Sequence, residues 1–163
     1  MTQIEKTQNY TAALLRITSV LENEMNPITV MAFTAAILKK TFPQFYWVGF
    51  LLVETNHMTV GPFQGPLACA RLSLNSPGVC GTCYRTARPV LVPDVAAFQG
   101  RVTCDSVSKS EIALPVVSGN RVVAVLDIDC TELAGVDEVD QWELEHIVRF
   151  IASRFQETQP DGT

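Results

Sequence analysis

The amino-acid sequence predicts an α+β fold, a single domain in which an antiparallel β-sheet is flanked by N-terminal and C-terminal helices. Two observations carry this prediction. Helical apolar periodicity opens and closes the chain, while the apolar runs between are short, rich in β-branched and aromatic residues, and joined by turn residues. Strands that follow one another through turns pair antiparallel, whereas alternating strands and helices would favour a parallel sheet.

Two helices are expected before the first strand. Residues 4–24 place apolar side chains three and four positions apart, the stripe of an amphipathic helix. The second helix is expected to begin with Asn26 as N-cap and Pro27 as its first residue, and to continue to Thr41, since Pro43 cannot extend it. The first stripe consists of Tyr10, Leu14, Ile17 and Leu21.

A β-hairpin follows these helices. Residues 45–54 are aromatic and β-branched enough for a buried strand, and a turn at residues 54–57 returns the chain along residues 58–63. Residues 64–78 show no clean periodicity and are expected to be irregular. Residues 78–87 are then expected to form a short helix.

The rest of the chain predicts a second hairpin and a closing helix. Residues 89–95 are expected to form a strand, residues 96–110 an irregular stretch, and residues 110–129 a hairpin that turns at residues 118–120. A helix with an acidic start follows over residues 137–155. Its expected apolar stripe consists of Trp142, Leu144, Ile147, Val148 and Ile151.

Length and composition also indicate one packed domain. The 163 residues suffice for a core without metal or disulfide support, and 47% of them are apolar against 18% charged. We therefore expect a single domain over residues 1–163, ordered over about residues 4–155, with residues 156–163 as a polar tail that frays.

Charge and hydropathy exclude several classes of partner. The net charge is -5 and no basic cluster occurs, whereas nucleic-acid binding depends on clustered Lys and Arg. The N-terminus lacks the pattern of a secretory signal, and no window approaches the 18 or more apolar residues of a membrane span. A cytoplasmic protein that binds neither nucleic acid nor membrane is expected.

Five cysteines are the most informative residues of the chain. An odd number without a signal peptide argues against a structural disulfide framework, so free thiols in a reducing compartment are expected. A single free thiol is more often a small buried apolar residue than a functional group. Four of the five nevertheless gather in segments expected as loop or short helix, where functional groups concentrate. The cysteines are Cys69, Cys80, Cys83, Cys104 and Cys130.

Cys80 and Cys83 have the C-x-x-C spacing of dithiol redox proteins, in which a helix N-terminus stabilises the first thiolate. No βαβ pattern surrounds them, so coincidence is favoured over a redox role. Structural zinc sites usually repeat such a tight pair, and this sequence does not, which leaves only distant cysteines or His57 and His146 as further ligands. We therefore expect no metal, and treat both histidines as structural or surface groups.

An acidic trio lies on the predicted C-terminal hairpin. Strand alternation points Asp127 and Asp129 to the same face, with Ile128 opposite, and Glu111 lies on the neighbouring strand. The trio is either a solvent-facing strand end or a cluster that binds a cation and keeps one carboxyl protonated. Trp47 lies in the first strand, where composition alone favours a core residue over a ligand wall.

The motifs together resemble those of the free methionine-R-sulfoxide reductases, enzymes built on a single GAF domain. General GAF sensors share the fold and a GVCGT-like helix start, whereas the three cysteines with SxSE and DID separate this family. The matching segments cover nearly all of residues 45–130. They are, in order, YWVGFLLVE, VGPFQGPLACARL, GVCGTCYRTARPVLVPDV, TCDSVSKSEIALPVV and VLDID.

The resemblance implies reduction of free L-methionine (R)-S-oxide to L-methionine through a cysteine sulfenic acid and a disulfide. It implies no bound cofactor. It also implies that thioredoxin, which receives electrons from NADPH through thioredoxin reductase, restores the dithiol. A residue inside a polypeptide should be rejected, since the ammonium and carboxylate of a free amino acid are recognised. The implied catalytic residues are Cys104, Cys69 and Cys80, and the implied substrate-binding residues are Trp47, Glu111, Asp127 and Asp129.

The chemistry requires a thiolate that attacks sulfur and an acid that protonates the departing oxygen. Cys104, a few residues ahead of Glu111, meets this need, and after oxidation we expect Cys104 to be joined to Cys69. Cys83 and Cys130 stand where relatives usually have a small non-thiol residue. Cys83 therefore competes with Cys69 as the resolving thiol, although a space-filling role is favoured.

Two other functions remain open at the level of sequence. A GAF ligand sensor would bind a small molecule without chemistry, but would have no need of three loop cysteines beside three acids. A general thiol-disulfide oxidoreductase would use Cys80 and Cys83 and would not discriminate for methionine sulfoxide. The sequence is compatible with a homodimer and leaves the oligomeric state open.

Overall fold

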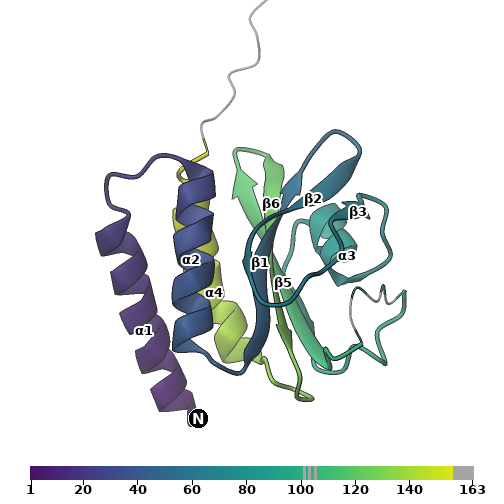
Figure 1. Ribbon diagram of the computed structural model, residues 1–163, viewed down its shortest axis with the longest axis horizontal. Coiled ribbons are helices and arrows are strands. Elements are labelled where there is room, and N and C mark those ends of the chain that lie inside the picture. The colour runs from purple at the N-terminus through teal and green to yellow at the C-terminus, as the bar shows by residue number, and fades with distance from the viewer. Residues whose placement is uncertain (101, 103, 105, 156–163) are drawn as a thin grey trace, which may run out of the picture.

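The computed structural model describes residues 1–100, 102, 104 and 106–155, and its elements form an α+β fold with a six-stranded antiparallel sheet (Figure 1). The predicted fold class is thereby confirmed. The fraying predicted for residues 156–163 lies outside the described residues. The helices are α1 (Gln3–Val20), α2 (Pro27–Thr41), α3 (Val79–Thr86) and α4 (Glu138–Ala152), and the strands are β1 (Phe45–Val53), β2 (His57–Gln64), β3 (Arg71–Ser73), β4 (Val90–Val92), β5 (Ser110–Ser118) and β6 (Arg121–Cys130).

The sheet joins two hairpins through a pairing of strands that are distant in sequence. Its strand order is β3-β2-β1-β6-β5-β4, so β1 and β6 lie at the centre. The edge strands β3 and β4 have three residues each, and β3 falls in the stretch expected to be irregular. Three residues are too short for alternation to be recognised, so the pairing with β2 decides the conformation there.

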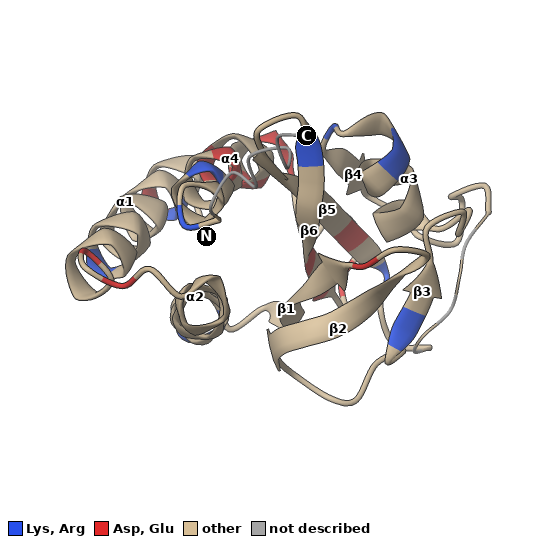
Figure 2. Ribbon diagram, turned by 90° about the horizontal axis from the view of Figure 1, so that it is seen from above, with Lys and Arg blue, Asp and Glu red and all other residues tan. Residues whose placement is uncertain are grey.

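The two faces of the sheet carry different layers (Figures 1 and 2). Helices α2 and α4 lie on one face with α1 packed against them, and α3 lies against the other face with the long loops. Strand alternation separates the side chains accordingly: Ile112 and Ile128 are in the core under α1, α2 and α4, whereas Ala113 and Val125 are in the smaller core under α3. The functional side chains described below lie on the α3 face.

The helix starts follow the predicted capping residues. The Asn26 side chain accepts from the backbone N–H groups of Ile28 and Thr29, and Pro27 opens α2. Asp137 caps α4 in a capping box with Asp140. Within the described residues, no helix is long and apolar enough to cross a membrane.

The prediction that Trp142 faces the core is wrong. Trp142 is 65% exposed and lies edge-on against His146, whereas Leu144, Ile147 and the remaining residues of the expected stripe are buried. Residues two positions apart in a helix lie about 200° apart around its axis, so Trp142 points away from the face on which Leu144 is buried.

A buried polar network attaches α1 to α4. The Lys6 ammonium donates to Asp137 Oδ2 at 2.8 Å and to Asp140 Oδ2 at 2.7 Å, and the Tyr10 hydroxyl donates to Asp140 Oδ1 at 2.8 Å. Asp140 is completely buried, and burial raises the pKa of its carboxyl despite these hydrogen bonds. The Lys6 ammonium therefore provides the positive charge that stabilises the buried carboxylate when Asp140 is ionised.

Candidate active site

The register of the central strands brings three predicted site residues into one row. Asp129 of β6 lies opposite Trp47 of β1 on one side and opposite Glu111 of β5 on the other. Asp127, two residues before Asp129, has its side chain on the same face, as predicted. A strand pairing across about 80 residues of sequence thus builds a surface of one indole and three carboxyl groups.

These side chains form the floor of a pocket whose walls come from α3 and the loops that carry Cys69 and Cys104. All seven predicted site residues line it, so the structure brings the whole set together. Leu51, Val60, Leu72 and Phe98 add apolar surface. Within the described residues, no Lys, Arg or His lines the pocket, so its charged groups are all acidic.

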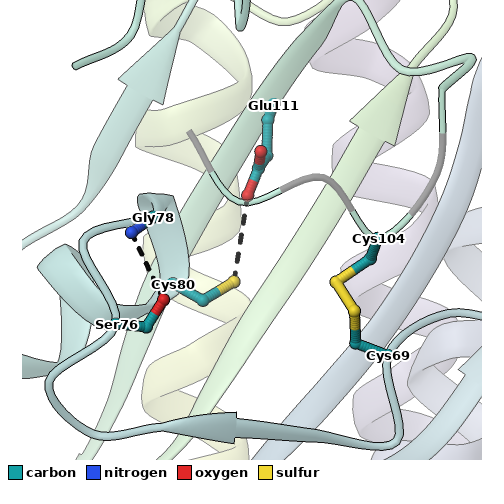
Figure 3. Close-up of a disulfide and its surroundings, with 6 residues drawn as sticks. All are labelled: Cys69, Ser76, Gly78, Cys80, Cys104 and Glu111. Atoms are coloured by element: carbon teal, nitrogen blue, oxygen red, sulfur yellow. Dashed lines mark hydrogen bonds between the residues drawn. A yellow bond between two sulfur atoms is a disulfide. The ribbon is translucent and has the colours of Figure 1, made fainter. Parts of the chain in front are cut away.

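Cys69 and Cys104 are joined by a disulfide at this pocket, with their sulfur atoms 2.11 Å and their Cα atoms 5.2 Å apart (Figure 3). The pairing is the one expected after oxidation. Cys104 is exposed and Cys69 is half-buried. The Cys80–Cys83 pair, the alternative redox pair, is not bridged: both residues carry free thiols.

The Cys80 thiol faces the acidic floor. It lies at the second position of α3 and donates to Glu111 Oε1 across 3.9 Å (Figure 3). Burial, followed by the neighbouring carboxylates of Asp127 and Glu111, raises the pKa of this thiol well above its usual range. Cys80 is therefore a neutral thiol at physiological pH, a poor nucleophile in this environment.

The close start of α3 depends on a glycine. A Cβ at Gly81 would lie 2.1 Å from the Ser76 carbonyl oxygen, a contact that no side chain allows. The Ser76 hydroxyl in turn accepts from the Gly78 backbone N–H at 3.3 Å (Figure 3). These contacts hold the first turn of α3, and Cys80 with it, against the pocket.

Three donor atoms are close enough to hold a cation. The Cys80 sulfur and one carboxylate oxygen each of Glu111 and Asp127 lie within 4.8 Å of one another. Cys83 is not part of this group. Structural zinc sites are built from Cys and His ligands, and one neutral thiol with two carboxylates differs from such a set. The same three groups can bind an ammonium group as well as a metal cation.

Trp47 is both core and pocket wall. It is 2% exposed, lines the pocket, and stacks on Phe63 with ring centroids 5.5 Å apart and planes inclined by 15°. A Cβ at Gly49 would lie 2.3 Å from the indole Cη2 atom, and one at Gly65 would lie 2.8 Å from Cδ1. The two glycines therefore leave the space in which the indole lies.

Sequence reasoning missed both glycines, and one signal could have found Gly49. A glycine two positions after a tryptophan on the same strand face marks a place where a large side chain approaches the backbone. Both histidines lie outside the pocket lining: His57 Nε2 is 3.0 Å from Glu54 Oε2, and His146 Nδ1 is 2.9 Å from the Trp142 carbonyl oxygen.

Comparison with known proteins places this geometry in a family. The family model of the GAF domain matches residues 24–156. The free methionine-R-sulfoxide reductase of Escherichia coli is 34% identical over 145 residues, which cover 89% of this chain and 87% of the relative. The chain belongs to the free methionine-R-sulfoxide reductases, on a GAF domain.

Solved structures of free methionine-R-sulfoxide reductases share the fold. That of Neisseria meningitidis, in complex with its substrate, is 39% identical with a TM-score of 0.86, covering 90% of this chain and 87% of the other. The reduced form of the Staphylococcus aureus protein is 38% identical with a TM-score of 0.85, covering 90% of this chain and 94% of the other. The GAF match begins after α1, so in this member of the free methionine-R-sulfoxide reductases the Lys6 network attaches a helix that the family model does not include.

Proposed function

We propose that this protein reduces free L-methionine (R)-S-oxide to L-methionine in the cytoplasm, with thioredoxin as the reductant. The observation that carries the proposal is the Cys69–Cys104 disulfide beside a pocket that also holds an indole and three carboxyl groups. Its membership of the free methionine-R-sulfoxide reductases supports the same activity.

The pocket suits the two ends of the substrate. The ammonium of a free amino acid is attracted by Glu111, Asp127 and Asp129, since no basic side chain is present among the described lining residues to compete. The S-methyl end requires an apolar surface, which the Trp47 indole offers. A peptide-bound residue has an amide in place of the ammonium and loses this attraction.

The reaction proceeds in balanced steps. The Cys104 thiolate attacks the sulfoxide sulfur, a pocket carboxyl group gives a proton to the oxygen, and the oxygen passes to Cys104 as a sulfenic acid while methionine leaves. The Cys69 thiol then attacks the Cys104 sulfur, releasing water and forming a disulfide. Thioredoxin reduces that disulfide with two electrons and two protons. Glu111 and Asp129 lie on opposite strands beside the site and are the proposed proton donors.

The test is an assay in which thioredoxin reductase, thioredoxin and NADPH regenerate the protein. NADPH consumption is expected with the free R epimer of methionine sulfoxide and little with the S epimer. A peptide that contains methionine sulfoxide is the matched control for recognition of the free amino acid. If neither epimer were consumed, the proposed activity would be wrong; equal rates on the peptide would refute recognition of the ammonium.

Gly49→Ala is expected to raise KM for methionine sulfoxide roughly tenfold, on the order of 1.4 kcal/mol, with a smaller effect on kcat. The new methyl group would overlap the Trp47 indole and the Phe63 Cβ atom, so the indole must leave its position in the pocket lining. Trp47 and Trp142 are the two tryptophans, so in a Trp142→Phe background the fluorescence of Trp47 reports this movement directly.

Gly61→Ala is the control for this experiment. Gly61 lies in β2, and a Cβ there would approach the flexible Leu52 side chain at 3.0 Å rather than the indole. KM and the Trp47 emission should stay close to wild type in this variant. An unchanged KM together with unchanged emission in Gly49→Ala would show that the indole does not depend on this glycine.

Cys83→Ala is expected to leave thioredoxin-dependent turnover within about a factor of two, under roughly 0.5 kcal/mol in barrier. Cys83 is completely buried in the core under α3, and burial raises the pKa of its thiol, so it is a poor resolving group. Mass spectrometry of the oxidised protein should find Cys69 joined to Cys104. A dominant Cys80–Cys83 bridge, with turnover lost in the variant, would make Cys83 the resolving thiol.

A further inference from the structure

We propose that exposed apolar side chains beside the Cys69–Cys104 disulfide form the docking surface for the protein dithiol that reduces it. These side chains are Leu67, Val102 and Val107, and together they are called the disulfide patch. The inference rests on the proposed function, because a disulfide formed in each turnover must be reduced before the next one.

The disulfide that Figure 3 shows joins two loops, and each loop carries part of the disulfide patch. Leu67 is two residues before Cys69, while Val102 and Val107 flank Cys104 at two and three residues. Leu67 is 88% exposed, the highest value among the large apolar residues described as exposed, and Val102 and Val107 are 43% and 45% exposed. Exposed apolar side chains therefore lie within three residues of each half of the disulfide.

The segment around Leu67 has the character of an interface. Residues 64–70 (QGPLACA) carry no charged side chain, although the chain as a whole has a net charge of -5. Leu67 does not line the pocket, so neither substrate binding nor the core accounts for an apolar side chain at this position. Depletion of charge with apolar residues at the centre is typical of the core of a protein interface.

The occupant must be a protein that carries a reactive dithiol. A thiolate that attacks a disulfide has to approach one sulfur atom to bonding distance. When the thiolate belongs to a protein, the surface of that protein around its thiolate contacts the residues that flank Cys69 and Cys104. A small thiol makes no such contact, so the disulfide patch matters for the protein reductant and not for a small one.

The step balances as two thiol–disulfide exchanges. The reductant thiolate attacks the Cys104 sulfur, since Cys104 is the more exposed partner; a mixed disulfide forms and Cys69 leaves as a thiolate that takes up a proton. The second thiol of the reductant loses its proton and attacks the mixed disulfide. Cys104 is released, and the reductant leaves oxidised by two electrons.

The experiment measures reduction of the purified, oxidised protein without methionine sulfoxide. Reduced thioredoxin and dithiothreitol are compared as reductants, and the free thiols of Cys69 and Cys104 are trapped by alkylation and quantified by mass spectrometry. Leu67→Ser is expected to lower the second-order rate with thioredoxin about fivefold to tenfold. The rate with dithiothreitol should stay within about a factor of two. Leu67→Ser combined with Val107→Ser should lower the thioredoxin rate further.

Two variants serve as controls. Leu67→Met keeps an apolar side chain and should retain the wild-type rate with thioredoxin. Leu15→Ser removes a side chain that is 64% exposed in α1, on the opposite face of the sheet, and should change neither rate. A thioredoxin variant that keeps only its attacking cysteine should be trapped on Cys104.

Equal thioredoxin rates for wild type and Leu67→Ser would overturn the proposal, as would an equal loss with both reductants, because that would place Leu67 in the stability or access of the disulfide itself. Since no methionine sulfoxide is used, failure of this inference is separate from failure of the proposed function. The latter is decided by consumption of the R epimer with dithiothreitol as the reductant.

Discussion

Cys104→Ser is expected to abolish the release of methionine when the reduced protein meets methionine sulfoxide without a reductant. Cys104 lies at the pocket opposite the carboxyl groups that can protonate the departing oxygen, and serine does not form the thiolate that the first step requires. The measurement is a single turnover under quenched-flow conditions, with methionine quantified per mole of protein. We expect no methionine above the detection limit from this variant.

Cys69→Ser separates attack from resolution. This variant should still release one methionine per protein molecule and retain a sulfenic acid on Cys104, which a dimedone adduct identifies by mass, because Cys69 acts only after the oxygen transfer. Cys80→Ser should also retain the first turnover, since burial beside the carboxylates raises the pKa of the Cys80 thiol and keeps it neutral. Loss of the first turnover in Cys80→Ser, with retention in Cys104→Ser, would reverse the two roles.

Lys6→Met is expected to lower the free energy of unfolding by about 3–5 kcal/mol at neutral pH. Methionine keeps much of the side-chain volume but leaves the completely buried Asp140 carboxylate without its cation. Urea unfolding at pH 7 measures the change. Lys40→Met, on the exposed end of α2, is the control and should stay within about 0.5 kcal/mol of wild type.

The pH dependence of this loss has a definite sign. Burial raises the pKa of Asp140 even with Lys6 present, and removing the ammonium raises it further. A group whose pKa is higher in the folded state than in the unfolded state gains stability for the fold as pH falls. The deficit of Lys6→Met should therefore shrink between pH 7 and about pH 4, the unfolded value. A deficit that grew over this range would contradict a buried, unpaired carboxylate as its cause.

Local sequence signals predicted the fold class and much of the site. Asn26 and Pro27 mark a helix start by residue type alone, and the alternation of Asp127, Ile128 and Asp129 assigns their faces without knowledge of the partner strands. The site residues were found together because the family motifs contain them, and the structure brings all of them to one pocket.

The remaining features depend on contacts between distant segments. The row of Trp47, Asp129 and Glu111 exists because β1 pairs with β6, which no local pattern encodes. The space that Gly49 leaves for the indole likewise follows from the fold, not from local propensity. Trp142 is apolar but lies on the exposed face, since it is two positions from Leu144 and only one of two such helical positions can face the core.

The disulfide has a topological consequence for the sheet. Between Cys69 and Cys104, at a sequence separation of 35, the chain contains β3, α3 and β4. Since β3 and β4 are the opposite edges of the sheet, the bridge closes a covalent ring that runs from one edge to the other across the α3 face. A single protease cut in this ring would leave one connected molecule when the protein is oxidised and two separable chains when it is reduced. Under the proposed mechanism, this covalent ring closes and opens once per turnover, on the face of the sheet that carries the pocket.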